Sequence, residues 1–458
     1  MVTISTAAAG SPAAAELPST ALLTDHYELT MLQAALRSGA AHRPSLFEVF
    51  ARRLPDGRRY GVVAGTGRVL DAIAAFRFEP DQLAFLDRTG VVDRRTLDWL
   101  AGYRFRGTVR GYAEGECYFA NSPILTVEST FAEAVLLETV ILSIMNHDSA
   151  IAAAASRMTS AAAGRPCIEM GSRRTHESAA VASARAAYLA GFASTSNLQA
   201  GYQYGVPTTG TAAHAFTLLH DSEREAFQTQ VDTLGKGTTL LVDTYDVAEA
   251  VRVAVEVAGP DLGAIRLDSG DLLWMAHRVR KQLDELGATG TRIVVTSDLD
   301  EYAIAALAIA PVDAYGVGTQ LVVGSGAPTA AMVYKLVARA ESDDPDAPLV
   351  PVAKKSVGKP SQGGRKFPYR RIDEDAVATE EVILVDSPAG PADRDLAGEL
   401  ADRGRPLLAP LIDRGEALDR PTLAESRALH QRALAELPVS ATQLSRGEPV
   451  IPTVYETN

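Results

Sequence analysis

The stretch from Ile168 to Phe216 brings together residue types that could bind an anion beside a nucleophile. It holds an arginine pair in I-E-M-G-S-R-R-T, small hydroxyl residues in G-F-A-S-T-S-N, and His214 among small residues in G-T-A-A-H-A-F. A guanidinium group matches the planar geometry of carboxylates and phosphates. Small neighbours leave room for a ligand to approach the imidazole of His214. On its own, however, a lone histidine is more often a structural residue than a nucleophile.

Acidic and glycine residues recur where short apolar segments end farther along the chain. Four such segments cover residues 239–243, 264–268, 293–298 and 313–318. Helical patterns lie between them, over 246–258, 271–287 and 299–310. The alternation predicts parallel strands joined by crossover helices. In barrels built this way, functional groups lie where strands end and loops begin.

The strand ends offer groups for binding phosphate and magnesium. Asp243, Asp268 and Asp298 could hold Mg²⁺ beside a phosphorylated ligand, although each could equally cap the helix that follows. Gly316 and Gly318 lie in Y-G-V-G-T, a turn whose backbone N–H groups could bind a phosphate. The sequence contains no P-loop, no G-x-G-x-x-G and no H-E-x-x-H motif.

The length and composition of the chain limit the functions that these groups could have. A chain of 458 residues is expected to form two lobes. A net charge of -13 argues against binding nucleic acid or an anionic membrane. Two cysteines, Cys117 and Cys167, are too few for a disulfide framework, which favours a cytoplasmic location. The apolar stretch Phe131–Met145 is interrupted by Glu133 and Glu138, so no membrane span is expected.

The first part of the chain predicts a mixed α/β lobe. Residues 1–20 have the composition of a disordered tail. A helix then begins at Thr24 or Asp25, with leucines on one face at positions 29, 32 and 36. Strands are expected at 46–50 and within 105–127.

Seven lysines and arginines fall within residues 354–371, with no acidic residue among them. A basic surface hairpin or a nucleic-acid patch would account for this composition, but aromatic residues are sparse and the whole chain is acidic. We favour a loop that reaches a phosphorylated ligand. The end of the chain predicts a strand at 382–385 and a helix at 422–437.

Six motifs in order resemble the nicotinate phosphoribosyltransferase family. They are T-D-x-Y-x-x-T-M at 24–31, E-M-G-S-R-R-T at 169–175, G-F-x-S-T-S-N at 191–197, G-T-x-A-H at 210–214, L-D-S-G-D at 267–271 and Y-G-V-G-T at 315–319. Each motif is weak by itself, whereas six in order are specific. The resemblance extends from about Leu22 to Arg371, and the version E-M-G-S-R-R-T-H-E-S is similar to the form common in actinobacteria.

The resemblance implies a fold and a reaction. The fold would be a type II phosphoribosyltransferase: an irregular α/β barrel over residues 131–344, beside a mixed α/β lobe built from residues 21–130 and 345–458. The reaction would convert nicotinate, 5-phosphoribosyl 1-diphosphate and ATP to nicotinate mononucleotide, diphosphate, ADP and phosphate in NAD salvage. Mg²⁺ would be the cofactor, ATP a co-substrate, and a homodimer would share the active site.

The resemblance also implies roles for individual residues. ATP would phosphorylate His214, which would act in catalysis with Arg173 and Asp268. Arg173 and Arg266 would flank the base and its neighbouring phosphates, and Asp243 and Asp268 would support the ribose or Mg²⁺. Tyr27 of a partner subunit would stack on the pyridine ring. Gly316, Gly318 and Thr319 would bind the 5-phosphate.

Ser196 bears on the choice of base. Related nicotinamide-specific enzymes carry an aspartate at the matching position, and a carboxylate there would repel nicotinate. Nicotinamide or quinolinate phosphoribosyl transfer remains an alternative, although a quinolinate enzyme would be shorter and richer in cationic groups. A sugar-phosphate aldolase would need a strand-end lysine, which the four strand ends lack. A catalytically inactive homologue is the alternative outside enzymes.

Overall fold

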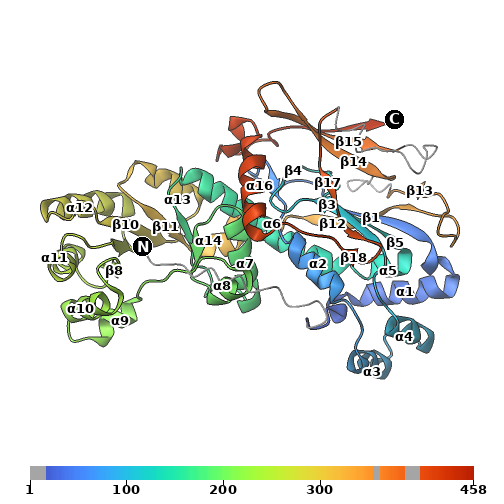
Figure 1. Ribbon diagram of the computed structural model, residues 1–458, viewed down its shortest axis with the longest axis horizontal. Coiled ribbons are helices and arrows are strands. Elements are labelled where there is room, and N and C mark those ends of the chain that lie inside the picture. Colours follow the sequence, from blue (N-terminus) through green and yellow to red (C-terminus); the bar gives the residue numbers. More distant parts are fainter. Residues whose placement is uncertain (1–16, 355–361, 387–402, 458) are drawn as a thin grey trace. The chain divides into compact units, whose positions relative to one another are not determined.

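The computed structural model describes residues 17–354, 362–386 and 403–457, which divide into two compact units (Figure 1). Residues 151–328 form the first unit. The second unit combines residues 17–150 with the described residues from 329 to 457. The sequence-based domain limits at 131 and 344 stay a prediction.

The first unit is built on a six-stranded parallel sheet, which curves as a half-barrel. The strand order is β7-β6-β11-β10-β9-β8, and every neighbouring pair is parallel. The strands are β6 (Cys167–Glu169), β7 (Ser194–Thr195), β8 (Thr239–Leu241), β9 (Ala264–Leu267), β10 (Arg292–Ser297) and β11 (Ala314–Val317). The four strands expected between residues 239 and 318 are therefore confirmed as β8 to β11, and the predicted α/β fold class is confirmed with them.

Helices alternate with these strands along the chain. They are α7 (Glu177–Leu189), α8 (Leu198–Tyr204), α9 (His214–Leu219), α10 (Glu223–Leu234), α11 (Val247–Ala258), α12 (Leu272–Glu285), α13 (Glu301–Ala306) and α14 (Thr319–Val322). Asp246, Asp271 and Asp300 cap α11, α12 and α13 by accepting hydrogen bonds from backbone N–H groups of the first turn. Because these residues cap the helices, the acidic residues that precede them at the strand ends do not. Those preceding residues are Asp243, Asp268 and Asp298.

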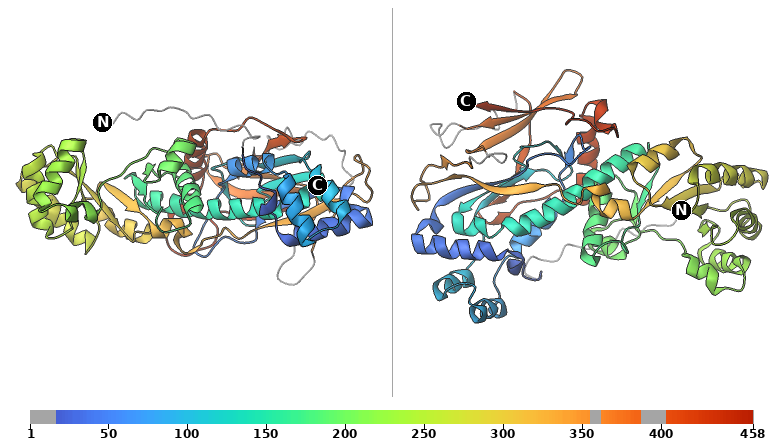
Figure 2. Two further views of the ribbon diagram at one scale, coloured as in Figure 1. Left: turned by 90° about the horizontal axis from the view of Figure 1, so that it is seen from below. Right: turned by 180° about the vertical axis from the view of Figure 1, so that it is seen from behind.

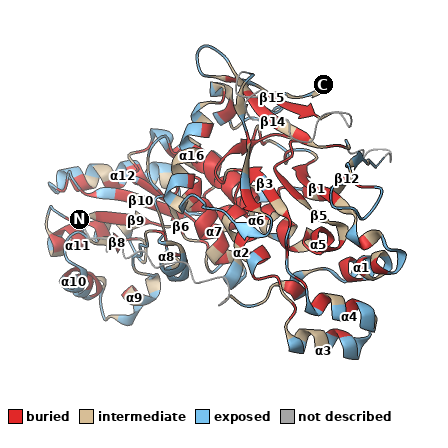
Figure 3. Ribbon diagram, turned by 45° about the vertical axis from the view of Figure 1, so that its right-hand side comes forward, coloured by how far each residue is buried: buried red, intermediate tan, exposed pale blue. Residues whose placement is uncertain are grey.

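The second unit is organised around a seven-stranded antiparallel sheet. Its order is β13-β12-β1-β5-β3-β17-β18. The strands are β1 (Pro44–Ala51), β3 (Thr108–Tyr112), β5 (Leu125–Thr130), β12 (Met332–Arg339), β13 (Val350–Pro351), β17 (Leu408–Asp413) and β18 (Glu416–Ala417). Because β1 pairs with both β5 and β12, segments from the two ends of the chain share one sheet, as the predicted fold class requires. Figure 3 shows the buried residues along β1, β3 and β5.

Helices α1 (His26–Ser38), α2 (Thr66–Ala74), α3 (Pro80–Thr89), α4 (Arg94–Ala101), α5 (Phe131–Val135) and α16 (Leu423–Ala435) also belong to this unit. The cap of α1 is Asp25, whose carboxylate accepts from the backbone N–H of His26. The predicted face of α1 is confirmed, since Leu29, Leu32 and Leu36 are all buried. Residues 1–16 of the expected tail lie outside the described residues. Thr20, at the end of that tail, contacts the folded unit, since its hydroxyl donates to the backbone oxygen of Ala72.

Helix α6 (Glu138–Ala161) begins inside the apolar stretch Phe131–Met145 and continues beyond its end. Val140, Ile141 and Met145 bury one side of this continuous helix. None of the described helices is long and apolar enough to cross a membrane.

A further sheet of the second unit contains the basic segment near residue 370. Its strand order is β16-β14-β15-β19, from β14 (Lys366–Ile372), β15 (Ala378–Val385), β16 (Arg405–Pro406) and β19 (Thr453–Thr457). Strands β14 and β15 form a hairpin, and β19 lies parallel beside β15 (Figure 2). A two-stranded ribbon, β2 (Gly61–Val62) with β4 (Cys117–Tyr118), completes the sheets.

Among the described residues of the basic segment, Lys354 is exposed, whereas two others are not. Lys366 and Arg370 are buried. The ammonium group of Lys366 lies 2.6 Å from a Glu48 carboxylate oxygen, and Arg370 pairs with Glu116 and Glu381. For Lys366 and Arg370 our interpretation as part of a ligand loop is therefore wrong, because both side chains are buried in ion pairs with acidic residues of the same unit. Lys355 and Lys359 lie outside the described residues.

Candidate active site

A cavity of about 500 Å³ opens at the carboxyl ends of the parallel strands in the first unit. Residues that directly follow β6, β7, β9, β10 and β11 contribute to its wall. The structure brings together eight of the residues singled out from the sequence: Arg173, Ser196, Arg266, Asp268, Asp298, Gly316, Gly318 and Thr319. They come from the ends of five strands, β6, β7, β9, β10 and β11, which meet because parallel strands end at one edge of the sheet.

Asp243 lies next to this wall rather than in it. Its Oδ2 accepts hydrogen bonds from the backbone N–H of Asp268, at 2.9 Å, and from the hydroxyl of Ser269, at 2.8 Å. Its Oδ1 is buried without a hydrogen-bond partner among the described residues. Asp243 therefore orients the L-D-S-G-D turn, and one of its oxygens keeps an unused acceptor.

His214 is the first residue of α9, directly after the wall residues Ala212 and Ala213. Its Nδ1 lies 3.1 Å from the Thr244 hydroxyl, which belongs to the loop after β8. This contact restrains the orientation of the imidazole ring, while the ring remains partly exposed.

Tyr27, the remaining candidate, belongs to the second unit and is 43% exposed. Burial of its ring edge and the nearby Glu138 and Glu28 carboxylates raise its pKa to about 12, so its hydroxyl stays protonated at neutral pH.

Three arginines line the cavity: Arg173, Arg174 and Arg266. Arg173 and Arg174 are exposed and make no ion pair with a described residue. Burial lowers the pKa of Arg266, the carboxylates of Asp268 and Asp243 raise it, and the charge of Arg173 lowers it again. Two guanidinium groups that repel each other across a cavity favour an anion between them.

Comparisons with known proteins agree with this geometry. The family model for the nicotinate phosphoribosyltransferase N-terminal domain matches residues 22–146. Nicotinate phosphoribosyltransferase pncB1 of Mycobacterium tuberculosis is 57% identical over 446 residues, which cover 94% of this chain and 94% of that protein. This chain belongs to the nicotinate phosphoribosyltransferase family.

More distant members of the family agree in sequence and in fold. The nicotinate phosphoribosyltransferase of Bacillus subtilis is 37% identical, covering 78% of this chain and 74% of that protein. The crystal structure of human nicotinic acid phosphoribosyltransferase matches with a TM-score of 0.78 and 27% identity, covering 95% of this chain and 97% of that one. The nicotinate-nucleotide pyrophosphorylase structure from Pyrococcus furiosus shares the fold, with a TM-score of 0.72 at 24% identity over 91% of this chain and 95% of that one.

The structure adds wall residues to which the sequence motifs assigned no individual role, including Ser172, Arg174 and Thr296. The Thr296 hydroxyl donates a hydrogen bond to Asp268, and thereby fixes the carboxylate that the family resemblance places near the ribose. Thr296 belongs to residues 293–298, one of the four strands expected from the sequence. Its contact with Asp268 depends on β9 and β10 being neighbours, which no local pattern reveals.

The acidic residues fit a magnesium ion only in part. The described residues contain no group of three or more histidine, cysteine or acidic side chains able to hold a metal. Mg²⁺ is commonly bound through one or two carboxylates together with substrate phosphates. The free acceptor of Asp243 and the carboxylate of Asp268 fit that mode of binding.

Proposed function

We propose that this protein transfers the phosphoribosyl group of 5-phosphoribosyl 1-diphosphate to nicotinate in NAD salvage. The observation that carries the proposal is the 57% identity to a nicotinate phosphoribosyltransferase over 94% of both chains. The cavity supports it, because its wall combines exposed arginines with carboxylates at the strand ends. Nicotinate mononucleotide and diphosphate would be the products.

The reaction develops opposite charges on two parts of the substrate. The pyridine nitrogen attacks the anomeric carbon, the carbon–nitrogen bond forms, and the diphosphate leaves with the electron pair of the broken carbon–oxygen bond. Positive charge develops on the sugar, where the carboxylate of Asp268 would stabilise it. Negative charge develops on the diphosphate, and Arg173 and Arg266 would stabilise this charge and the carboxylate of the base.

The other substrate contacts follow the family pattern. We place the 5-phosphate at the turn formed by Gly316, Gly318 and Thr319, whose backbone approaches closely because glycine has no side chain. Ser196 offers a neutral hydroxyl near the base, so the carboxylate of nicotinate meets no repulsion. Tyr27 from a second copy of the chain would stack on the pyridine ring, which makes the functional unit a homodimer.

His214 would couple the reaction to ATP. Its imidazole nitrogen attacks the γ-phosphorus, a nitrogen–phosphorus bond forms, and ADP leaves; water later releases phosphate from the phosphohistidine. Support comes from its position directly after two cavity residues. Asp243 or Asp268 would hold Mg²⁺, which neutralises charge on the diphosphate when bound. Both cysteines are buried and free, in keeping with work in the cytoplasm.

The test is product formation by purified protein with 5-phosphoribosyl 1-diphosphate and Mg²⁺, with nicotinate or nicotinamide, with and without ATP. We expect nicotinate mononucleotide, formed faster with ATP. Intact-mass analysis should show one added phosphoryl group after incubation with ATP, absent in His214→Ala and retained in His277→Ala, a control at an exposed histidine. Nicotinamide mononucleotide as the main product would overturn the choice of base, and no nucleotide from either base would indicate an inactive homologue.

A further inference from the structure

Glu169 is a fully buried carboxylate at the end of β6 that does not belong to the cavity wall. Its two oxygens bond to two different loops. One accepts a hydrogen bond from the backbone N–H of Gly171, and the other accepts from the hydroxyl of Thr195. We call residues 170–174 the arginine turn and residues 194–197 the hydroxyl turn. Arg173 lies in the first and Ser196 in the second.

Further contacts bind the two turns to each other. The backbone N–H of Ser196 donates to the backbone oxygen of Glu169 at 2.8 Å. The side-chain amide of Asn197 donates to the hydroxyl of Ser172 at 2.9 Å, which joins the hydroxyl turn directly to the arginine turn. The two turns therefore form one connected unit, with the Glu169 side chain at its centre.

The packing around this carboxylate leaves no spare room. A Cβ atom on Gly171 would lie 2.2 Å from Val322 Cγ1 and 3.0 Å from Glu169 Oε1. Because the neighbouring groups are in contact, a change at Glu169 must displace one turn or leave a buried polar group without a partner.

The hydrogen-bond pattern needs a carboxylate rather than an amide. Thr195 has one hydroxyl proton, which it donates to Glu169, and its oxygen accepts from the backbone N–H of Asn197 at 2.9 Å. Both oxygens of Glu169 therefore act as acceptors. A glutamine would present an NH₂ group to one of these donors: facing Gly171 it would lose that bond, and facing Thr195 it would force the hydroxyl to turn its proton away and accept instead.

We propose that Glu169 is a positioning residue that holds the arginine turn and the hydroxyl turn at the separation needed to bind one nicotinate. This inference rests on the proposed function, because Arg173 and Ser196 are assigned to the base there. Glu169 itself touches no substrate. Its loss should weaken nicotinate binding, since small misplacements of binding groups reduce affinity and rate strongly.

The experiment compares Glu169→Gln with Glu177→Gln. The control removes the same charge at the start of α7, where the carboxylate is 86% exposed. In Glu169→Gln we expect the KM for nicotinate to rise about tenfold or more, with a smaller change in the KM for 5-phosphoribosyl 1-diphosphate. Thr195→Val removes the partner hydroxyl and should reproduce the effect, whereas Thr195→Ser keeps the hydroxyl and should restore nearly normal values.

Hydrogen exchange of the ligand-free proteins supplies a second readout that needs no turnover. The backbone amides of the two turns should exchange faster in Glu169→Gln than in Glu177→Gln or the unaltered protein. Unchanged KM for nicotinate together with unchanged exchange would overturn the proposal. A lower melting temperature with unchanged KM would also overturn it, as it would show a role in stability alone.

The outcomes separate this inference from the proposed function. If the unaltered protein forms no nicotinate mononucleotide, the proposed function fails, and hydrogen exchange alone decides whether Glu169 joins the turns. If Glu169→Gln does not fold, Thr195→Val decides the question by the same two measurements.

Discussion

Single side chains at the cavity wall set the charge that a substrate meets. Arg173 is exposed, Arg266 is partly buried, and the charge of Arg173 helps to lower the pKa of Arg266. Ser196 lies in the same wall and carries no charge. The charges of these residues therefore favour an anionic ligand, and under the proposed function the charge at position 196 should control the preference between nicotinate and nicotinamide.

We predict that Ser196→Asp reverses or abolishes the preference for nicotinate. Two carboxylates about 4 Å apart repel by about 1–4 kcal/mol, depending on solvent exposure, which corresponds to a rise of about fivefold to several hundredfold in the KM for nicotinate. The KM for nicotinamide should not rise to the same extent. Ser196→Asn is the neutral control. An unchanged ratio of kcat/KM for the two bases would show that Ser196 does not set the choice.

At the scale of elements, each strand–loop–helix unit divides its acidic residues between two tasks. In the loops after β8 and β9, Asp246 and Asp271 cap the next helix, whereas Asp243 and Asp268 point into a hydrogen-bond network at the sheet edge. Glycines then allow the strands and loops to approach closely. A Cβ on Gly316 would lie 2.4 Å from Thr296 Cγ2.

We predict that Gly316→Ala lowers stability by about 1–3 kcal/mol, because the added methyl group overpacks β10 against β11. It should also raise the KM for 5-phosphoribosyl 1-diphosphate, since Thr296 would shift and move its partner Asp268. Urea unfolding and steady-state kinetics measure the two effects. Gly290→Ala, where no atom lies within 4 Å of the added Cβ, should change neither. Wild-type behaviour of Gly316→Ala would contradict the predicted close packing.

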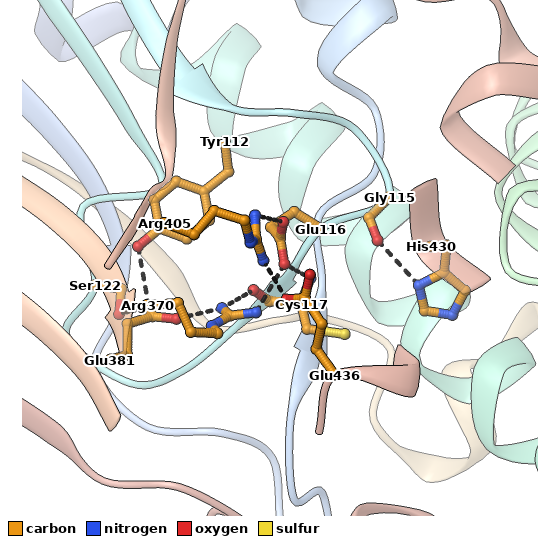
Figure 4. A network of polar contacts seen from close by, with 10 residues as sticks. All are labelled: Tyr112, Gly115, Glu116, Cys117, Ser122, Arg370, Glu381, Arg405, His430 and Glu436. Carbon is orange, nitrogen blue, oxygen red and sulfur yellow. Dashed lines mark hydrogen bonds and ion pairs between the residues drawn. The ribbon is translucent and has the colours of Figure 1, made fainter. Parts of the chain in front are cut away.

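At the scale of the whole molecule, a buried network of charges joins distant parts of the chain within the second unit (Figure 4). Arg370 pairs with Glu116 and Glu381, and its guanidinium also donates to the backbone oxygen of Cys117. Arg405 adds a second cation, with a nitrogen 2.8 Å from Glu116. The network links the first 130 residues to the last 90 in one folded unit.

Arg370→Leu should destabilise the protein by about 3–5 kcal/mol, because it leaves two buried carboxylates without their main partner. Arg371→Leu is the matched control: its side chain is 41% exposed, so losing its pairs with Glu380 and Glu456 should cost about 0–1 kcal/mol. Equilibrium unfolding in urea gives both values. Equal effects of the two substitutions would show that burial of Arg370 is not what makes its pairs important.

The proposed homodimer also makes a prediction at this scale. Tyr27→Ala and His214→Ala subunits should each be inactive alone, whereas a refolded mixture should regain up to about a quarter of wild-type activity per site under random pairing of the subunits. The regained activity follows because one site of a mixed dimer would have both residues intact. If native mass spectrometry shows mixed dimers but the mixture stays inactive, Tyr27 and His214 belong to the site of the same subunit.

The sequence by itself determined the local elements and the motifs at their ends. Periodicity and capping residues located α1, α11, α12 and the strands β8 to β11, because these signals act over a few neighbouring residues. Motifs at the strand ends supplied eight cavity residues for the same reason. Only the tertiary structure decided which remote groups meet. Strand order and burial bring together residues with no local relation in the chain. Examples are the pairing of Lys366 with Glu48, the contact of Thr296 with Asp268 and the two segments joined by Glu169.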